Sequence, residues 1–108
     1  MADDYQIEIP VSFMDLYTDA VRRKPTASRE VVAARYELCE DMANLLTPTA
    51  QDMQFSLGIT ESDALQRCLQ GLQGEAAVVN AAEARWVVCR LAELAGWPLP
   101  SFAAHLSD

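Results

Sequence analysis

The sequence predicts an all-α fold: a compact bundle of about five short helices, preceded by an extended, strand-like N-terminal arm. Apolar residues recur every three or four positions over most of the chain, which is the period of an amphipathic helix. Proline, glycine and helix-capping residues divide this pattern into segments of about 10 to 18 residues. The connections between these segments are short, as in compact helical domains.

The length and composition predict a single domain. The chain has 108 residues, a common size for one domain, with 51% hydrophobic and 22% charged residues, as in ordinary globular proteins. We therefore expect one helical domain over residues 1–108, with the arm at 1–11 and a short tail at 98–108.

The arm is the only segment with a strand-like pattern. Residues Tyr5 to Ile9 alternate apolar and polar side chains, and Pro10 ends the pattern. The arm either lies across the helices, with Ile7 and Ile9 as anchors, or pairs with a strand of another chain.

The first helix is expected from Phe13 to Lys24. Ser12 precedes it as the N-cap, and Asp15 follows in a capping-box pattern. Pro25 ends it. The basic residues of its last turn face the negative end of the helix dipole, which accounts for them without a ligand: Arg22, Arg23 and Lys24.

The second and third helices are expected on either side of a proline. Ser28 opens the second, which has the clearest amphipathic pattern in the chain. The pair Thr47-Pro48 ends it and begins the third helix, because proline suits the first helical position. Gly58 ends the third helix.

The fourth and fifth helices carry recognisable caps. Thr60 and Asp63 begin the fourth, which unravels into a loop over residues 69–74. Asn80 and Glu83 form a capping box for the fifth helix. Gly96 ends this last helix, with Trp97 folding back on the final turn.

The charge balance excludes several classes of ligand. Sixteen acidic residues against eight basic ones give a net charge of −8, so we expect neither nucleic acid nor an anionic membrane as a partner. The charge serves solubility or, alternatively, an acidic face mimics nucleic acid for a basic partner. The chain has no apolar run long enough to span a membrane and no secretory signal. Its three widely spaced cysteines fit a reducing compartment, so we predict a cytoplasmic location.

The sequence offers no signature of catalysis. It has no GxxxxGK[ST], GxGxxG or GxSxG motif. His105 is the only histidine and lies near the C-terminus. None of the three cysteines is closely paired with another, as a structural zinc site requires: Cys39, Cys68 and Cys89. We therefore predict no catalytic residue, no cofactor and no metal site, and we do not expect an enzyme.

One face of the fifth helix is a candidate contact surface. Trp86, Arg90 and Glu93 lie away from its apolar stripe. An exposed tryptophan beside an arginine is typical of the residues that dominate interface energetics. The alternative is that the tail or the N-terminal arm covers Trp86 within the same chain.

Three runs of sequence resemble a family of short bacterial proteins: residues 33–43, 82–88 and 90–97. Members of that family are sometimes labelled "ATPase with chaperone activity". The resemblance implies a place near a chaperone system. It also implies ATP binding, from which this sequence departs, because its only lysine, Lys24, stands directly before Pro25.

The sequence thus predicts a non-enzymatic protein-interaction module: an adaptor, a regulator or a chaperone-associated protein. It would bind a protein partner or a second copy of itself through contact residues of the arm and the fifth helix: Ile7, Ile9, Trp86, Arg90 and Glu93. The alternative is a small enzyme or ligand-binding domain with a pocket between helices, near Tyr17, Tyr36 and Cys39.

Overall fold

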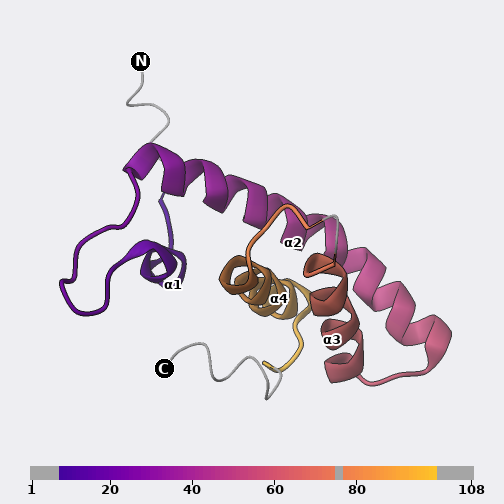
Figure 1. Cartoon of the computed structure of the whole chain (residues 1–108). Helices are drawn as coiled ribbons and strands as arrows, with labels where there is room; N and C mark the ends of the chain where they lie inside the picture. The colour runs from indigo at the N-terminus through magenta and orange to yellow at the C-terminus, as the bar shows by residue number, and fades with distance from the viewer. Residues whose placement is uncertain (1–7, 75–76, 100–108) are drawn as a thin grey trace.

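The structure, a computed structural model, describes residues 8–74 and 77–99, and helices are its main secondary structure (Figure 1). The elements in chain order are α1 (Val11–Met14), the 3-10 turn η2 (Asp15–Tyr17), α2 (Arg29–Leu57), α3 (Glu61–Leu72) and α4 (Ala81–Ala95). The described residues form no β-strand, apart from an isolated bridge between Thr18 and Pro25. The predicted all-α class is confirmed.

The long helix α2 organises the other elements. Figure 1 shows α4 packed beneath the middle of α2 and α3 beneath its C-terminal half, while α1 lies near the N-terminal part of α2. The core between them is apolar because each helix turns its apolar stripe inward. Its largest fully buried apolar side chains are Phe13, Leu65 and Leu91.

The predicted break at Thr47-Pro48 is wrong, because α2 runs through Pro48 as one helix of 29 residues. Pro48 is exposed, and the fully buried Ala43 and Ala50 fix the helix against the core on both sides of it. Thr47 Oγ1 also donates a hydrogen bond of 2.7 Å to the carbonyl of Ala43. Tertiary packing therefore outweighs the local cost of the proline.

The first helix is much shorter than predicted, because helical structure ends at Tyr17. Asp19 diverts the backbone: its Oδ1 accepts hydrogen bonds from the N–H groups of Val21 and Arg22. The basic residues at 22–24 therefore lie in a turn, and the helix-dipole explanation for them is wrong.

Ser12 is not the N-cap of α1. Pro10 occupies that position without a side-chain cap, and its carbonyl accepts from the N–H groups of Phe13 and Met14, at 3.0 Å each. The hydroxyl of Ser12 is used elsewhere, as an acceptor for Trp86. The prediction of Ser12 as the N-cap is wrong because Trp86, which is distant in the sequence, uses the Ser12 hydroxyl as its acceptor.

The remaining predicted caps are confirmed. Ser28 and Thr60 each accept a backbone N–H of the first turn, and Asn80 forms a complete capping box with Glu83. Gly58 and Gly96 end α2 and α4 with φ of 63° and 72°, a left-handed conformation that glycine adopts without strain. The helix α3 continues to Leu72, inside the predicted loop, because the Leu72 side chain is buried in the core.

Most of the predicted strand-like arm, residues 1–7 of 1–11, falls outside the described residues; residues 8–10 form no strand, and Val11 begins α1. Ile7 lies outside the described residues, as does the tail from residue 100 onward, including His105. Ile9 is described, and its half-buried side chain packs against the core. In the described part of the chain, no helix is both long enough and apolar enough to cross a membrane.

Candidate functional site

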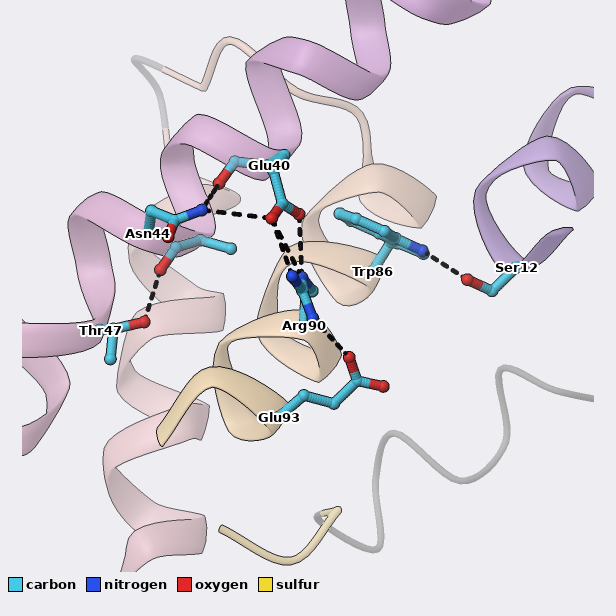
Figure 2. Close-up of polar contacts among 8 residues, drawn as sticks. Ser12, Glu40, Asn44, Thr47, Trp86, Arg90 and Glu93 are labelled. Atoms are coloured by element: carbon cyan, nitrogen blue, oxygen red, sulfur yellow. Dashed lines mark hydrogen bonds and ion pairs between the residues drawn. The ribbon is translucent and has the colours of Figure 1, made fainter. Parts of the chain in front are cut away.

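Trp86 is buried, so the prediction of an exposed tryptophan is wrong. Its side chain is only 7% exposed, and its Nε1 donates a hydrogen bond of 2.9 Å to Ser12 Oγ, as Figure 2 shows. The Phe13 ring packs edge-on against it, with ring centroids 5.0 Å apart. The alternative, cover by the tail or the arm, is confirmed only in that the same chain covers Trp86, because the covering residues Ser12 and Phe13 follow the arm.

Trp86 belongs to an aromatic cluster that joins four elements: α1, η2, α2 and α4. Phe13 lies at its centre and contacts Tyr17 and Tyr36 as well as Trp86, with centroid distances of 5.0 to 5.8 Å. Edge-to-face pairs of this kind stabilise a fold by about 0.5 to 1.5 kcal/mol each beyond their burial. The cluster fixes the N-terminal segment to α2 and α4.

A buried carboxylate network lies next to this cluster. Glu83 is fully buried at the start of α4 and accepts two hydrogen bonds from the Arg35 guanidinium, from Nε at 2.9 Å and from Nη2 at 2.7 Å. The Tyr17 hydroxyl and the Asn80 backbone N–H also donate to it. Arg35 Nη2 further donates to the carbonyl of Val78, at 2.9 Å.

These donors keep Glu83 ionised. Burial alone raises the pKa of this carboxyl, but the hydrogen bonds from Arg35, Tyr17 and Asn80 outweigh burial and lower it to about 2. Burial and the adjacent Glu83 carboxylate raise the pKa of the Tyr17 hydroxyl. A general base needs a free lone pair and a pKa near the working pH. Both oxygens of Glu83 accept hydrogen bonds and its pKa is low, so we assign this carboxylate a structural role.

Arg90 connects α4 to α2 through a second ionic group (Figure 2). Its Nε and Nη2 donate to the Glu40 carboxylate at 2.9 to 3.2 Å, and its Nη1 donates to Glu93 Oε1 at 2.9 Å. The hydrogen bonds from Arg90 lower the pKa of Glu40 despite its partial burial. The Arg90 and Glu93 side chains are 33% and 61% exposed, so both reach the surface as predicted.

A hollow of about 840 Å³ lies beside this ionic group, and we call it the α4 hollow. Its floor is one stripe of α4 that begins at Ala82 and Trp86 and ends at Glu93. Its wall is the N-terminal segment between Pro10 and Arg23. Leu99, just after α4, also lines it.

The α4 hollow combines apolar and charged side chains. The wall contributes Leu16 and Ala20 beside Asp15 and Arg23, and the floor adds the half-buried thiol of Cys89. Burial raises the pKa of that thiol, so it is protonated at neutral pH and is not an activated nucleophile.

The predicted pocket near Tyr17, Tyr36 and Cys39 coincides with the hollow only at Tyr36. Tyr17 is bound to Glu83, and the fully buried Cys39 has its pKa raised to about 12 by burial. Within residues 8–74 and 77–99, no three side chains of histidine, cysteine or acidic type are grouped to hold a metal ion.

The predicted contact residues therefore separate into three groups. The structure brings Trp86, Arg90 and Glu93 together along the α4 hollow. Trp86 is buried in the floor of the hollow, and the other two side chains reach the surface. Ile9 packs elsewhere against the core, and Ile7 lies outside the described residues. The chain matches no protein-family model, no curated protein and no solved structure.

Proposed function

We propose that the protein is a non-enzymatic interaction module that receives a segment of a partner protein in the α4 hollow. It would act as an adaptor, a regulator or a chaperone-associated protein. The observation that carries this proposal is the hollow itself, which is formed between two elements that are distant in sequence and is lined by both apolar and charged side chains. Protein interfaces commonly combine apolar and polar groups.

The floor supports a helical or extended partner segment. Ala82, Trp86, Cys89 and Glu93 recur along α4 at the spacing of one helix face. Such a row offers a continuous ridge against which a second helix packs. The N-terminal wall contacts the first part of this row at Trp86, whose Nε1 donates a hydrogen bond to Ser12 Oγ.

The electrostatics of the surrounding groups support binding rather than catalysis. Glu40 and Glu93 are both paired with Arg90, and hydrogen bonding lowers the pKa of Glu40. A general acid at neutral pH needs the opposite shift. An arginine already held by two carboxylates is preorganised, which reduces the entropy lost when a partner binds.

The test places a photo-crosslinking amino acid at Ala20, an exposed residue of the hollow wall. The matched control carries it at Ala34, an exposed alanine of α2 that does not line the hollow. We expect crosslinking in native cell extract to yield a discrete protein adduct from position 20 only. A second variant, Ala20→Trp, fills the hollow without altering the core, and it should abolish capture of the same protein by the tagged chain.

The volume of the hollow also suits a small molecule, since ligand pockets span roughly 300 to 1,000 Å³. That alternative makes a different prediction for the same variants. A metabolite would raise the melting temperature of the parent protein and of the Ala34 control, but not of Ala20→Trp. Such a result, together with no adduct at position 20, would replace the interaction module by a ligand-binding domain.

A further inference from the structure

The turn between Thr18 and Pro25, which we call the basic turn, has a defined conformation. The Asp19 N–H donates to the Lys24 carbonyl and the Arg23 N–H donates to the Asp19 carbonyl, both at 2.7 Å. Thr18 and Pro25 form a β-bridge at its base. Arg23 adopts a φ of 60°, which is unusual for a residue with a side chain. The turn is therefore a constrained loop, and it lies at the outer edge of the molecule in Figure 1.

The side chains at the tip of the basic turn are exposed. Val21 is 91% exposed, and the three residues that follow it are exposed as well. None of these three forms an ion pair with another described residue of the chain: Arg22, Arg23 and Lys24. The turn thus combines an exposed apolar side chain with three exposed cations, in a protein whose net charge is −8.

We propose that the basic turn selects an acidic segment of a protein partner. The inference rests on the proposed function, because Arg23 also lines the α4 hollow and places the turn at its rim. A segment seated in the hollow would extend past this rim. Carboxylates on that segment would meet the three cations, and an apolar side chain would cover Val21.

Charge complementarity favours an acidic protein segment over nucleic acid. Nucleic acid carries one negative charge per phosphate along its whole length, so most of a bound strand would be repelled by a protein whose net charge is −8. A short acidic segment meets only the turn and avoids that repulsion. Electrostatic matching of this kind contributes mainly to specificity and to the rate of association.

The experiment selects peptides from a random displayed library on the intact protein and measures the affinity of the selected peptides by fluorescence anisotropy. Two variants each lower the net charge by two. Arg22→Gln/Arg23→Asn neutralises the turn, with asparagine chosen because it tolerates the left-handed conformation at position 23. Arg67→Gln/Arg85→Gln removes two exposed arginines of α3 and α4 that do not line the hollow.

We expect the selected peptides to be enriched in aspartate and glutamate, and to bind the turn variant about fivefold more weakly than the parent. The affinity of the Arg67/Arg85 variant should stay within about twofold of the parent value. A peptide with glutamine in place of glutamate should bind the parent about fivefold more weakly. Binding should also weaken with added salt.

Three results would overturn the inference in different ways. Peptides that are blocked by Ala20→Trp but show no acidic enrichment would exclude the acidic partner and leave the interaction module standing. Failure to select any peptide that Ala20→Trp blocks would count against both proposals. Tighter binding of a single-stranded oligonucleotide than of any peptide, lost in the Arg22/Arg23 variant, would make nucleic acid the ligand of the turn.

Discussion

Glu83 is the residue on which the attachment of the N-terminal segment most depends. It completes the capping box of α4, pairs with Arg35 of α2 and accepts a hydrogen bond from Tyr17, so one carboxylate joins three parts of the chain. A fully buried charge is stabilising only when its partners satisfy it. Here no polar side-chain atom in the described residues is both buried and without a hydrogen bond.

Glu83 should contribute to acid unfolding in a defined pH window. Its pKa is about 2 in the folded protein against an ordinary value of 4.5, so its stabilising effect is complete above pH 4.5 and is lost as the pH falls towards 2. We expect Glu83→Gln to lower the free energy of unfolding at pH 7 by on the order of 3 kcal/mol. The difference from the parent should shrink between pH 5 and pH 2 in urea titrations followed by circular dichroism.

The control for this prediction is Glu30→Gln, which removes an exposed carboxylate of the first turn of α2 that belongs to neither ionic group. Its free energy of unfolding at pH 7 should lie within about 0.5 kcal/mol of the parent value. A stability difference for Glu83→Gln that stayed constant from pH 7 to pH 2 would show that the carboxylate is not the stabilising species.

Phe13 anchors the N-terminal segment through packing. It is fully buried and contacts three other aromatic rings, so Phe13→Ala should reduce the free energy of unfolding by about 3 to 4 kcal/mol. The loss should also expose the Trp86 indole and shift its fluorescence to longer wavelength, in a background where Trp97→Phe leaves one tryptophan. Val11→Ala, at a residue 75% exposed, should change neither property. An unchanged emission maximum in Phe13→Ala would mean that other residues shield Trp86.

At the scale of the helix, α2 contains a proline that its own backbone does not favour. A proline within a helix removes one hydrogen bond and crowds the carbonyl four residues earlier. The helix persists because buried alanines on each side of Pro48 fit closely against the core. The folded protein therefore carries the free-energy cost of Pro48, and a mutation that replaces the proline should remove it.

We expect Pro48→Ala to stabilise the protein by about 1 to 3 kcal/mol, since it restores a backbone donor at an exposed position without touching the core. Differential scanning calorimetry measures the rise in melting temperature. The control Gln51→Ala, at another exposed position of α2, should add only a few tenths of a kcal/mol. A lower melting temperature for Pro48→Ala would indicate that the proline fixes a bend on which the packing of α3 depends.

The helix ends could be predicted where a local side chain decides them. Asn80 with Glu83, and Gly96 at the end of α4, are recognisable from neighbouring residues alone. The outcome at Thr47-Pro48 could not be predicted this way, because the buried neighbours that sustain the helix are set by tertiary packing. Asp19 could have been recognised as a competitor for the backbone, since aspartate favours turns over helix interiors.

The candidate site was predictable only in part. Arg90 and Glu93 reach the surface as their position on α4 indicates, whereas Trp86 is covered by residues more than seventy positions earlier in the chain. The Glu83–Arg35 pair left one signal in the sequence: two opposite charges, each placed on the apolar face of its helix. Helical periodicity does not reveal that these faces meet, because it contains no information about how helices pair.

At the scale of the whole molecule, the described part of the chain consists of a three-helix body and an attached N-terminal segment over residues 8–27. The body is held by packing among α2, α3 and α4. The segment is held by the packing of Phe13 on Trp86, by the hydrogen bond that Tyr17 donates to Glu83 and by the one that Ser12 accepts from Trp86. Because this segment is the wall of the α4 hollow, its attachment sets the width of the proposed binding surface.

This division predicts that the segment opens without unfolding of the body. Tyr17→Phe removes the hydrogen bond to Glu83 and keeps the ring that packs on Phe13. A hydrogen bond to a charged group is worth about 1.5 kcal/mol or more, so amide hydrogen exchange over residues 8–27 should accelerate about tenfold. Exchange in α3 and α4 should not change, and mass spectrometry of peptic fragments measures both regions.

The matched control is Tyr36→Phe, which removes the hydroxyl of another tyrosine of the same cluster, one that makes no hydrogen bond within the described residues. It should leave exchange over residues 8–27 at the parent rate. Equal acceleration along the whole chain in Tyr17→Phe would show that segment and body unfold as one unit. In that case the hollow would be a rigid surface, and a partner would have to fit it without any opening of its wall.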